Sequence, residues 1–362
     1  MHRVLVLGAG KIGSLITCLL SESGEYEVHL GERSEQACGR LHKSKNLTIT
    51  TLDATDEAAI TNYLKKHKLE AVVSALPYYC NPLIAKLARE NGLHYFDLTE
   101  DVNVTNQVKN LSKGAKTTFL PQCGLAPGFI SIVANDLMKR FYSLDTVKMR
   151  VGALPVNPSN VLKYSLTWST DGLINEYGNP CQAIDHGELI TTQPLEGYET
   201  ITVDGLLYEA FNTSGGLGSL ADSYADKIHK MNYKTLRYPG HCEKIHLLMN
   251  ELRLNEDRDT LKRILENSIP KTTQDVVLIY VSVTGMMNDQ LYEKNFVQKI
   301  YPREIAGILW SAIQITTASG ICGVLDLVLQ NPKAYQGFVT QERFALQDFL
   351  NNQFGQYYAA DT

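Results

Sequence analysis

Apolar and polar residues alternate in blocks over the first 120 residues, and the blocks predict strands separated by helices. The run Val4–Leu7 is unbroken and apolar, which is typical of a short strand buried on both faces. The segment after it keeps the helical period, with apolar residues at Ile12, Leu15, Ile16, Leu19 and Leu20. Further strands are predicted at 26–30, 47–51, 71–76, 94–98 and 117–120. Helices are predicted at 56–68 and from the capping pair Asn81-Pro82 to Gly92.

From Val147 onward the pattern changes to longer alternating runs, which predict a mixed sheet with helices between its strands. Strands are predicted at 147–154, 162–168, 200–203, 276–284 and 291–300, and the last two flank Met287-Asn288-Asp289 as a hairpin. Helices are predicted at 220–231, 242–252 and 258–266.

The expected fold class is α/β, with a Rossmann domain followed by an α+β domain. Residues 1–122 are predicted to form a doubly wound parallel sheet, because strands alternate with helices throughout. Residues 123–304 are expected to form a mixed-sheet substrate and dimerisation domain, and helices in 305–362 to return to the first domain. A length of 362 residues suits more than one simple core.

Charge and composition narrow the partners and the setting. The formal net charge of -5 and the pI near 6.0 argue against nucleic acid or an anionic membrane as the main partner. The apolar stretch 305–329 is interrupted by polar residues, so we expect a buried helix or helix pair rather than a membrane span. The seven cysteines are scattered without a C-x-x-C pair, and the N-terminus enters a strand without a secretory signal. We therefore expect a reduced, cytoplasmic protein.

The first candidate site is the loop after the first strand. Gly8, Gly10 and Gly13 have the G-x-G-x-x-G spacing, between a predicted strand and a predicted helix. The first glycine allows a tight turn, the second lets a pyrophosphate approach the backbone, and the third lets the helix pack close to the strand. Lys11 and Ile12 lie in the same turn, where the helix N-terminus offers free N–H groups to phosphates. The loop predicts a dinucleotide cofactor.

The acidic residue that follows the second strand bears on which dinucleotide is bound. Glu32 stands about 20 residues beyond the glycines, where a carboxylate accepts hydrogen bonds from the adenosine ribose hydroxyls. Arg33 and Ser34 come next and are placed to contact a 2′-phosphate, but Glu32 would repel that phosphate. We therefore favour NAD, with NADP as the alternative.

Other candidate residues follow the later strands of the first domain, since ligands of such folds lie outside the carboxyl ends of the strands. The further cofactor candidates are Asp53, Ala54, Ala75, Leu76 and Pro77. Asp97 is a candidate acid or base, or a partner for an ammonium group, and its alternative role is a helix N-cap for the segment after Thr99. Cys123 is a candidate for substrate contact, and its alternative role is that of a small buried apolar residue.

Aromatic and basic residues supply the remaining candidates. Tyr78 and Tyr79 are a predicted substrate contact and a further candidate base, or else pack against the nicotinamide. In the second domain Trp168 is a polar anchor, and Arg237 is the cation expected to bind a substrate carboxylate, with a surface ion pair as its alternative role. His241 is another candidate base. No metal site is expected, because His241 and His246 are five residues apart, which turns two helical side chains away from each other.

These residues resemble the saccharopine dehydrogenase-like family, and most closely its lysine 6-dehydrogenase branch. The resemblance covers nearly the whole chain. Its motifs are VLVLGAGKIG at 4–13, SALPYY at 74–79, YFDLTED at 95–101, CGLAPG at 123–128, GALPVNPSNVLKYSLTWS at 152–169, LINEYGNP at 173–180 and TLRYPGHCEKI at 235–245.

The resemblance implies reversible hydride transfer between NAD(P) and the amine-bearing carbon of a lysine-like amino acid, by a homodimer. In the lysine branch the terminal carbon is oxidised and the product cyclises, whereas in the saccharopine branch a secondary amine is made or broken. Two alternatives remain open. One is a dinucleotide-binding regulator without turnover, and the other is a polyamine reductase of the carboxynorspermidine type.

Overall fold

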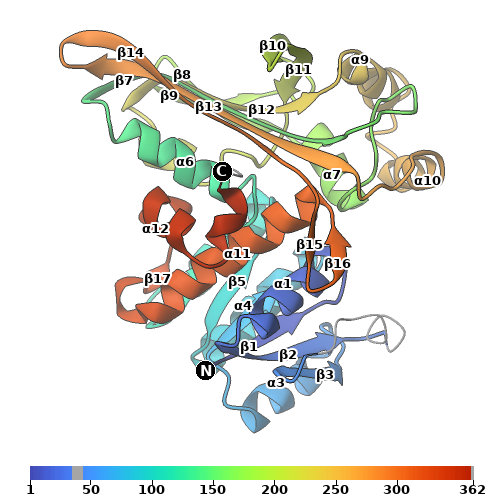
Figure 1. Ribbon diagram of the computed structural model, residues 1–362, viewed down its shortest axis with the longest axis vertical. Helices are drawn as coiled ribbons and strands as arrows, with labels where there is room; N and C mark the ends of the chain where they lie inside the picture. The colour runs from blue at the N-terminus through green and yellow to red at the C-terminus, as the bar shows by residue number, and fades with distance from the viewer. Residues whose placement is uncertain (35–43, 360–362) are drawn as a thin grey trace. The chain divides into compact units, whose positions relative to one another are not determined.

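The computed structural model describes residues 1–34 and 44–359, which form two compact units (Figure 1). Of the described residues, the first unit contains 1–34, 44–129, Ile305–Ile308 and 314–359, and the second contains Ile130–Glu304 and Leu309–Ile313. Residues 123–129, which the sequence analysis assigned to the second domain, belong to the first unit in this division.

The first unit is built on a seven-stranded parallel sheet with strand order β17-β6-β5-β4-β1-β2-β3. The direction of winding reverses between β1 and β4, because β1 is followed by β2 on one side and flanked by β4 on the other. A doubly wound sheet was predicted, and this prediction is confirmed. The strands are β1 (His2–Leu7), β2 (Tyr26–Glu32), β3 (Leu47–Thr51), β4 (Ala71–Ser74), β5 (His94–Asp97), β6 (Thr118–Leu120) and β17 (Gly337–Phe338).

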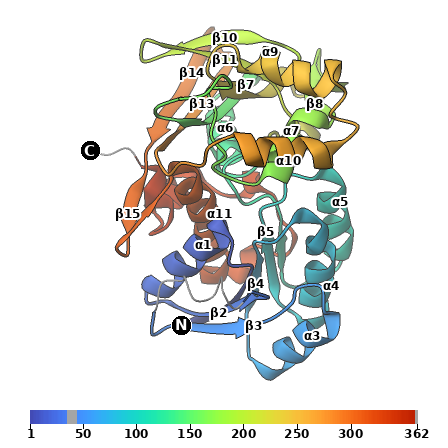
Figure 2. The ribbon, with the colours of Figure 1, turned by 90° about the vertical axis from the view of Figure 1, so that its right-hand side faces the viewer.

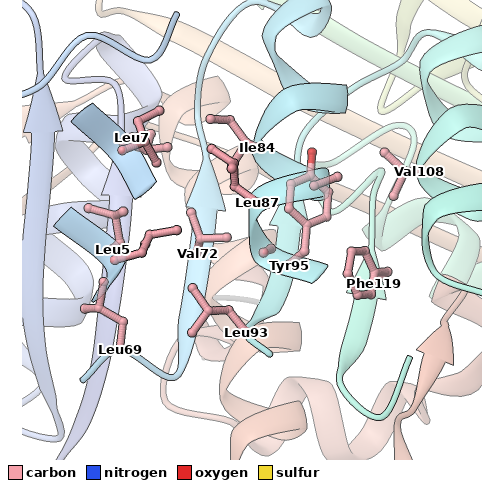
Figure 3. Close-up of a cluster of buried hydrophobic side chains, with 14 of the residues drawn as sticks. Leu5, Leu7, Leu69, Val72, Ile84, Leu87, Leu93, Tyr95, Val108 and Phe119 are labelled. Atoms are coloured by element: carbon pink, nitrogen blue, oxygen red, sulfur yellow. The ribbon is translucent and has the colours of Figure 1, made fainter. Parts of the chain in front are cut away.

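Helices cover both faces of this sheet (Figure 2). On one face, α3 (Glu57–Lys66), α4 (Asn81–Asn91) and α5 (Val102–Leu111) enclose an apolar core, which includes Leu5, Val72, Ile84, Tyr95 and Val108 (Figure 3). On the other face lie α1 (Lys11–Glu22) and α11 (Ala312–Gln330). The short helix α12 (Leu346–Asn351) follows them in the chain.

The C-terminal part of the chain is tied into the first unit by buried contacts. Tyr26 of β2 donates a hydrogen bond to Asp326 of α11, and Asn352 donates another to the same carboxylate. The ring of Tyr358 stacks on Phe129 with 3.7 Å between centroids. By length and composition α11 would be able to cross a membrane, but 78% of its most apolar stretch is buried, as in the core helix of a globular protein.

The second unit is built on an eight-stranded mixed sheet, with β8 and β9 attached beside the main order β10-β11-β12-β7-β13-β14. Only β12 and β7 pair in parallel, and the neighbouring pairs are antiparallel. The predicted hairpin is present as β13 and β14. The strands are β7 (Ser143–Pro155), β8 (Cys181–Asp185), β9 (Glu188–Thr192), β10 (Glu199–Val203), β11 (Leu206–Asn212), β12 (Ile228–Arg237), β13 (Asp275–Met287) and β14 (Gln290–Ile300).

Five helices accompany this sheet, namely α6 (Phe129–Met138), α7 (Thr170–Gly178), α8 (Leu220–Tyr224), α9 (His241–His246) and α10 (Arg258–Ser268). Residues of α7, α9 and α10 share one apolar core with the loop 162–168. Its members include Tyr164, Leu173, Tyr177, Ile245 and Leu261.

Two segments of the second unit differ from their predicted structure. The predicted strand 162–168 is a loop, because Asn160 and Pro270 bind its backbone in place of a neighbouring strand, while Tyr164 and Leu166 are still buried. The predicted helix 220–231 ends at Tyr224, and its last four residues begin β12, whose pairing with β7 overrides the local helical period.

Two helix starts also differ from the prediction. Asn81 is the first residue of α4 instead of its N-cap, and its side chain accepts a hydrogen bond from Ser74 at 2.7 Å. The predicted helical region from 305 begins with the hairpin β15 (Arg303–Ile305) and β16 (Ile308–Trp310). Helix α11 starts only at Ala312, where Asp275 accepts hydrogen bonds from the backbone N–H groups of Ala312 at 2.6 Å and Ile313 at 3.1 Å.

Candidate functional site

The candidate cofactor crevice lies where the winding of the first sheet reverses. The loop after β1 leads into α1, and the loop after β4, residues 75–77, leads into a short 3-10 helix at Tyr78–Cys80. The two loops touch, because a Cβ atom added at Gly8 would lie 2.8 Å from the carbonyl oxygen of Ala75. Doubly wound sheets bind their ligands at this position.

The three glycines of the first loop have different surroundings. Gly8 has a φ of +97°, a left-handed conformation that favours glycine. A Cβ atom on Gly13 would lie 2.0 Å from the carbonyl oxygen of Gly8, so α1 begins too close to the strand for any side chain. In contrast, a Cβ atom on Gly10 would meet no atom within 4 Å. The space beside Gly10 therefore fits a pyrophosphate at the helix N-terminus.

Glu32 lies at the end of β2, beside the same loop. Its Oε2 atom accepts a hydrogen bond from the backbone N–H of Ala9 at 2.8 Å, and its Oε1 atom accepts one from Ser34 at 2.9 Å. These two contacts fix a carboxylate beside the glycine loop, where a ribose diol is bound in dinucleotide folds.

The other predicted cofactor residues surround the crevice at varying depth. Asp53 is exposed, and hydrogen bonds from the backbone and hydroxyl of Thr55 lower its pKa. Arg33 is exposed and close enough to Asp53 to lower that pKa further. Lys11 and Pro77 are exposed, and the carbonyl oxygen of Lys11 accepts a hydrogen bond from Gln314 at 2.9 Å. Ile12 and Ala75 are half-buried. Ala54 and Leu76 pack on the apolar core of the first unit.

Tyr78 and Tyr79 follow β4 on the surface of the first unit. Tyr79 is 68% exposed, Tyr78 is half-buried, and their rings meet edge to face with 5.8 Å between centroids. Both side chains therefore lie next to the loop that contacts Gly8.

Asp97 is completely buried at the end of β5. Its carboxylate accepts hydrogen bonds from the Tyr95 hydroxyl at 2.7 Å and from the backbone N–H groups of Thr99 at 2.9 Å and Gln122 at 3.2 Å. Burial raises the pKa of Asp97 to about 6 although these bonds oppose the shift. The N-cap of α5 is Asp101, so the alternative role considered for Asp97 is wrong. Its contacts join the loop after β5 to the loop after β6, and a catalytic role stays a prediction.

Cys123 is also buried, in the loop after β6. Its thiol donates to the carbonyl oxygen of Leu120 at 3.0 Å and accepts a hydrogen bond from Gln341 at 3.5 Å. Burial raises the pKa of this thiol well above its usual range, so it stays protonated and a poor nucleophile. These surroundings favour the alternative role of a small buried residue.

In the second unit, Arg237 at the end of β12 is buried among aromatic rings. Its guanidinium carbon lies 4.9 Å from the ring centroid of Tyr164 and 5.7 Å from that of Tyr177, and the residue is only 2% exposed. Burial alone would lower the pKa of Arg237, but the nearby hydroxyls of Tyr177 and Tyr164 and the carboxylate of Glu176 raise it, so the side chain is charged. A surface ion pair, the alternative role considered for Arg237, is therefore wrong.

His241 and Trp168 belong to the same cluster. The Nε2 atom of His241 lies 3.0 Å from the Tyr177 hydroxyl, and its Nδ1 atom lies 2.8 Å from the carbonyl oxygen of Leu162. Burial and Arg237 lower the pKa of His241 to about 3, so the imidazole is neutral near pH 7. Trp168 is half-buried and donates from Nε1 to the hydroxyl of Tyr164 at 3.1 Å.

The structure therefore brings together Trp168, Arg237 and His241, three predicted residues that are up to 73 positions apart in the sequence. Sequence reasoning did not single out Tyr164. Its position, four residues before the selected Trp168, was the one local indication that it belongs to the same cluster. Within residues 1–34 and 44–359, no three histidine, cysteine or acidic side chains are arranged to hold a metal ion.

Each of the two units matches the model of a known protein family. Residues 4–119 match the saccharopine dehydrogenase NADP binding domain, and residues 124–354 match the saccharopine dehydrogenase C-terminal domain. The chain belongs to the saccharopine dehydrogenase family. The predicted resemblance to that family is thus confirmed, and so is the prediction of a nicotinamide dinucleotide cofactor, NAD or NADP.

Individual relatives are distant. A saccharopine dehydrogenase [NADP(+), L-glutamate-forming] from Pyricularia oryzae is 23% identical over 95% of this chain and 81% of its own length. The mitochondrial alpha-aminoadipic semialdehyde synthase of Mus musculus is 24% identical over 67% of this chain, but the match spans only 27% of that longer protein.

A solved structure has the same fold over nearly all of the chain. The apo saccharopine dehydrogenase (L-Glu forming) from Saccharomyces cerevisiae matches 97% of this chain and 96% of its own, with a TM-score of 0.78 and 16% sequence identity. This likeness confirms the predicted fold class, a Rossmann-like parallel sheet and a second mixed sheet.

The two helix-start glycines give a matched pair of variants. We expect Gly13→Ala to destabilise the fold by about 2 kcal/mol or more, because its methyl group would overlap the Gly8 carbonyl. We expect Gly10→Ala to cost less than about 1 kcal/mol of stability and yet to weaken dinucleotide binding about tenfold or more. Chemical denaturation and calorimetry with NADH measure the two effects. Unchanged NADH affinity in Gly10→Ala would show that the pyrophosphate is bound elsewhere.

Asp97→Asn separates a structural role from a catalytic one. The folded protein holds a proton on Asp97 more tightly than the unfolded chain, so its contribution to stability is present below pH 3.8 and is lost as the pH rises through about 6. We expect the stability of the wild type relative to Asp97→Asn to fall by roughly 1–3 kcal/mol between pH 4 and 6.5. Turnover at pH 7.5 separates the two roles: a loss of about a hundredfold is expected if Asp97 is the base, whereas a change within about threefold would leave it only the structural role.

Proposed function

We propose that the chain is an NAD(P)-dependent dehydrogenase of the saccharopine type, which oxidises the amine-bearing carbon of a lysine-like amino acid. The observation that carries the proposal is the buried, charged Arg237 of the second unit, whose hydrogen-bond partners within the described residues are neutral. Such a cation suits the carboxylate of an amino-acid substrate. The glycine loop of the first unit supplies the cofactor site.

Saccharopine is the substrate that we place first. The relative from Pyricularia oryzae, whose name gives saccharopine oxidation with L-glutamate as a product, matches 95% of this chain. When bound, the dinucleotide would supply the hydride acceptor for the amine-bearing carbon. The oxidised substrate would then take up water, and its carbon–nitrogen bond would break to give glutamate and an aldehyde. L-Lysine, oxidised at its terminal carbon, is the second candidate, because the motifs along the chain resemble most closely the lysine 6-dehydrogenase branch.

The side chains of this protein have distinct tasks in that reaction. The cradle at Gly8 to Gly13 would hold the pyrophosphate, and Glu32 the adenosine ribose. Arg237 would hold a substrate carboxylate. A base must deprotonate the amine before hydride transfer. Four residues were predicted to be catalytic. Three of them, Asp97, Cys123 and His241, are buried and hydrogen-bonded, whereas Tyr79 is exposed within its unit.

We further propose that NAD is used in preference to NADP. Glu32 is held beside the glycine loop by Ala9, and Asp53, which is exposed, adds a second carboxylate at the same end of the sheet. Both charges oppose a 2′-phosphate, while Arg33 is the cation nearest to them in the described part of the loop. We also keep the homodimer and the cytoplasmic setting as proposals, and the latter agrees with the six described cysteines, which are all free.

A nicotinamide absorbance assay tests the activity directly. L-Saccharopine and L-lysine are each supplied with NAD+ and NADP+, and we expect turnover with saccharopine and NAD+. Turnover with lysine alone would assign the lysine 6-dehydrogenase reaction instead. Dinucleotide binding by calorimetry without turnover on either amine would favour a regulator, and turnover of carboxynorspermidine would favour the polyamine reductase.

Glu32→Ser tests the cofactor preference. Removing the carboxylate removes both a ribose acceptor and a source of repulsion, so we expect the KM for NAD+ to rise about tenfold and the KM for NADP+ to fall. Asp56→Ser is the matched control, because Asp56 is a helix N-cap of the same unit and serine preserves that cap. A wild-type preference for NADP+ would contradict the proposed role of Glu32.

A further inference from the structure

Two buried arginines of the second sheet differ in how their charge is compensated. Arg150 of β7 is 1% exposed, and its Nε atom donates to Glu199 at 2.6 Å. Lys234 donates to the other oxygen of that carboxylate at 2.9 Å. Arg237 is equally buried, yet it forms no ion pair with a residue of the described chain. The hydroxyls of Tyr177 and Tyr164 and the carboxylate of Glu176 favour the charged form of Arg237, while the hydrogen bonds of its Nε and Nη1 atoms go to neutral groups, so the guanidinium suits a carboxylate ligand.

A directed chain of hydrogen bonds holds Arg237. The Leu162 carbonyl can only accept, so the Nδ1 atom of the neutral His241 carries the proton and its Nε2 atom must accept. The Tyr177 hydroxyl donates to that Nε2 atom over 3.0 Å. Its oxygen is then free to accept from the Nε atom of Arg237, over 2.8 Å. The direction of donation is therefore fixed in each of these three hydrogen bonds.

Two further hydrogen bonds and one aromatic ring hold the rest of the guanidinium. Its Nη1 atom donates to the Thr235 hydroxyl at 3.0 Å and to the Leu236 carbonyl at 2.9 Å. The ring of Tyr164 lies over the guanidinium. No hydrogen bond of Nη2 to a residue of the described segments is found, so this edge is the one left for a ligand. Without the Tyr177 hydroxyl, Nε loses its acceptor and the orientation of Nη2 is less restricted.

We propose that Tyr177 and His241 are positioning residues, which hold the guanidinium of Arg237 in the orientation that binds the carboxylate of the amino-acid substrate. The inference rests on the proposed function and adds two residues to it. It also gives His241 a task other than that of a base, because both of its ring nitrogens are already engaged.

Three variants test the chain of hydrogen bonds one link at a time. Tyr177→Phe deletes only the hydroxyl, His241→Asn keeps a donor near Nδ1 but removes the acceptor at Nε2, and His241→Gln restores an acceptor near Nε2. We expect the first two to raise the KM for the amino-acid substrate about tenfold, with kcat and the KM for the cofactor within twofold of wild type. His241→Gln should recover most of the loss. If His241→Asn does not fold, Tyr177→Phe decides.

Tyr208→Phe is the matched control. Tyr208 is 2% exposed, lies on the same sheet and stacks on Tyr238, outside the Arg237 cluster. We expect it to leave both KM values unchanged. An active wild type whose substrate KM is unaffected by Tyr177→Phe would overturn the proposal, and so would parallel changes of substrate KM, cofactor KM and thermal stability, which indicate a general structural role.

Glutarate, a plain dicarboxylate, separates this proposal from the proposed function. Its binding to the NAD-loaded protein is measured by calorimetry for the wild type, Tyr177→Phe and Tyr208→Phe. If the wild type oxidises no amine but binds glutarate, and Tyr177→Phe alone loses about tenfold in affinity, the positioning role stands and the proposed function fails. A wild type that neither oxidises an amine nor binds glutarate overturns both.

Discussion

The close approach of α1 to the end of β1 is the constraint on which the first unit depends. Gly13 has no room for a side chain because a Cβ atom there would lie 2.0 Å from the carbonyl oxygen of Gly8, at the point where the helix begins. The same geometry leaves Gly10 open on its outer side and presents the Ala9 N–H to Glu32. The reversal of winding between β1 and β4 then brings a second loop to the same place. The close approach at Gly13 and the pairing of β1 with β2 and β4 thus place the glycine loop, the open side of Gly10 and Glu32 together.

Much of the first unit could be predicted from the sequence, because its strands and helices are specified locally. The glycine spacing, the buried run Val4–Leu7 and the helix end at Gly92 each need only neighbouring residues. The second unit depends more on distant partners. Residues 162–168 alternate like a strand but receive their hydrogen bonds from Asn160 and Pro270, and residues 228–231 continue a helical pattern but pair with β7. A local period cannot reveal which of these long-range partners is present.

The candidate site shows the same limit at the level of single residues. Asp97, Cys123 and His241 were selected because their side chains can perform chemistry, but reactivity depends on burial and hydrogen bonding, which the sequence does not encode locally. Arg150 lies near the middle of β7 and Arg237 at the end of β12, and in the sequence both are arginines within largely apolar runs. Only the fold shows that one has Glu199 as a counterion and the other has tyrosines.

The first unit is assembled from segments that are far apart in the chain, and this has a consequence during synthesis. Its sheet is completed by β17, and the face that carries α1 is also covered by α11, so both additions are made about 200 residues after β6. A chain that emerges from the ribosome N-terminus first must therefore keep an apolar sheet face and an unpaired strand edge uncovered while the whole second unit is translated. We expect the nascent chain to depend on chaperones during that interval, and the dinucleotide-binding unit to be poorly suited to expression as a contiguous N-terminal fragment.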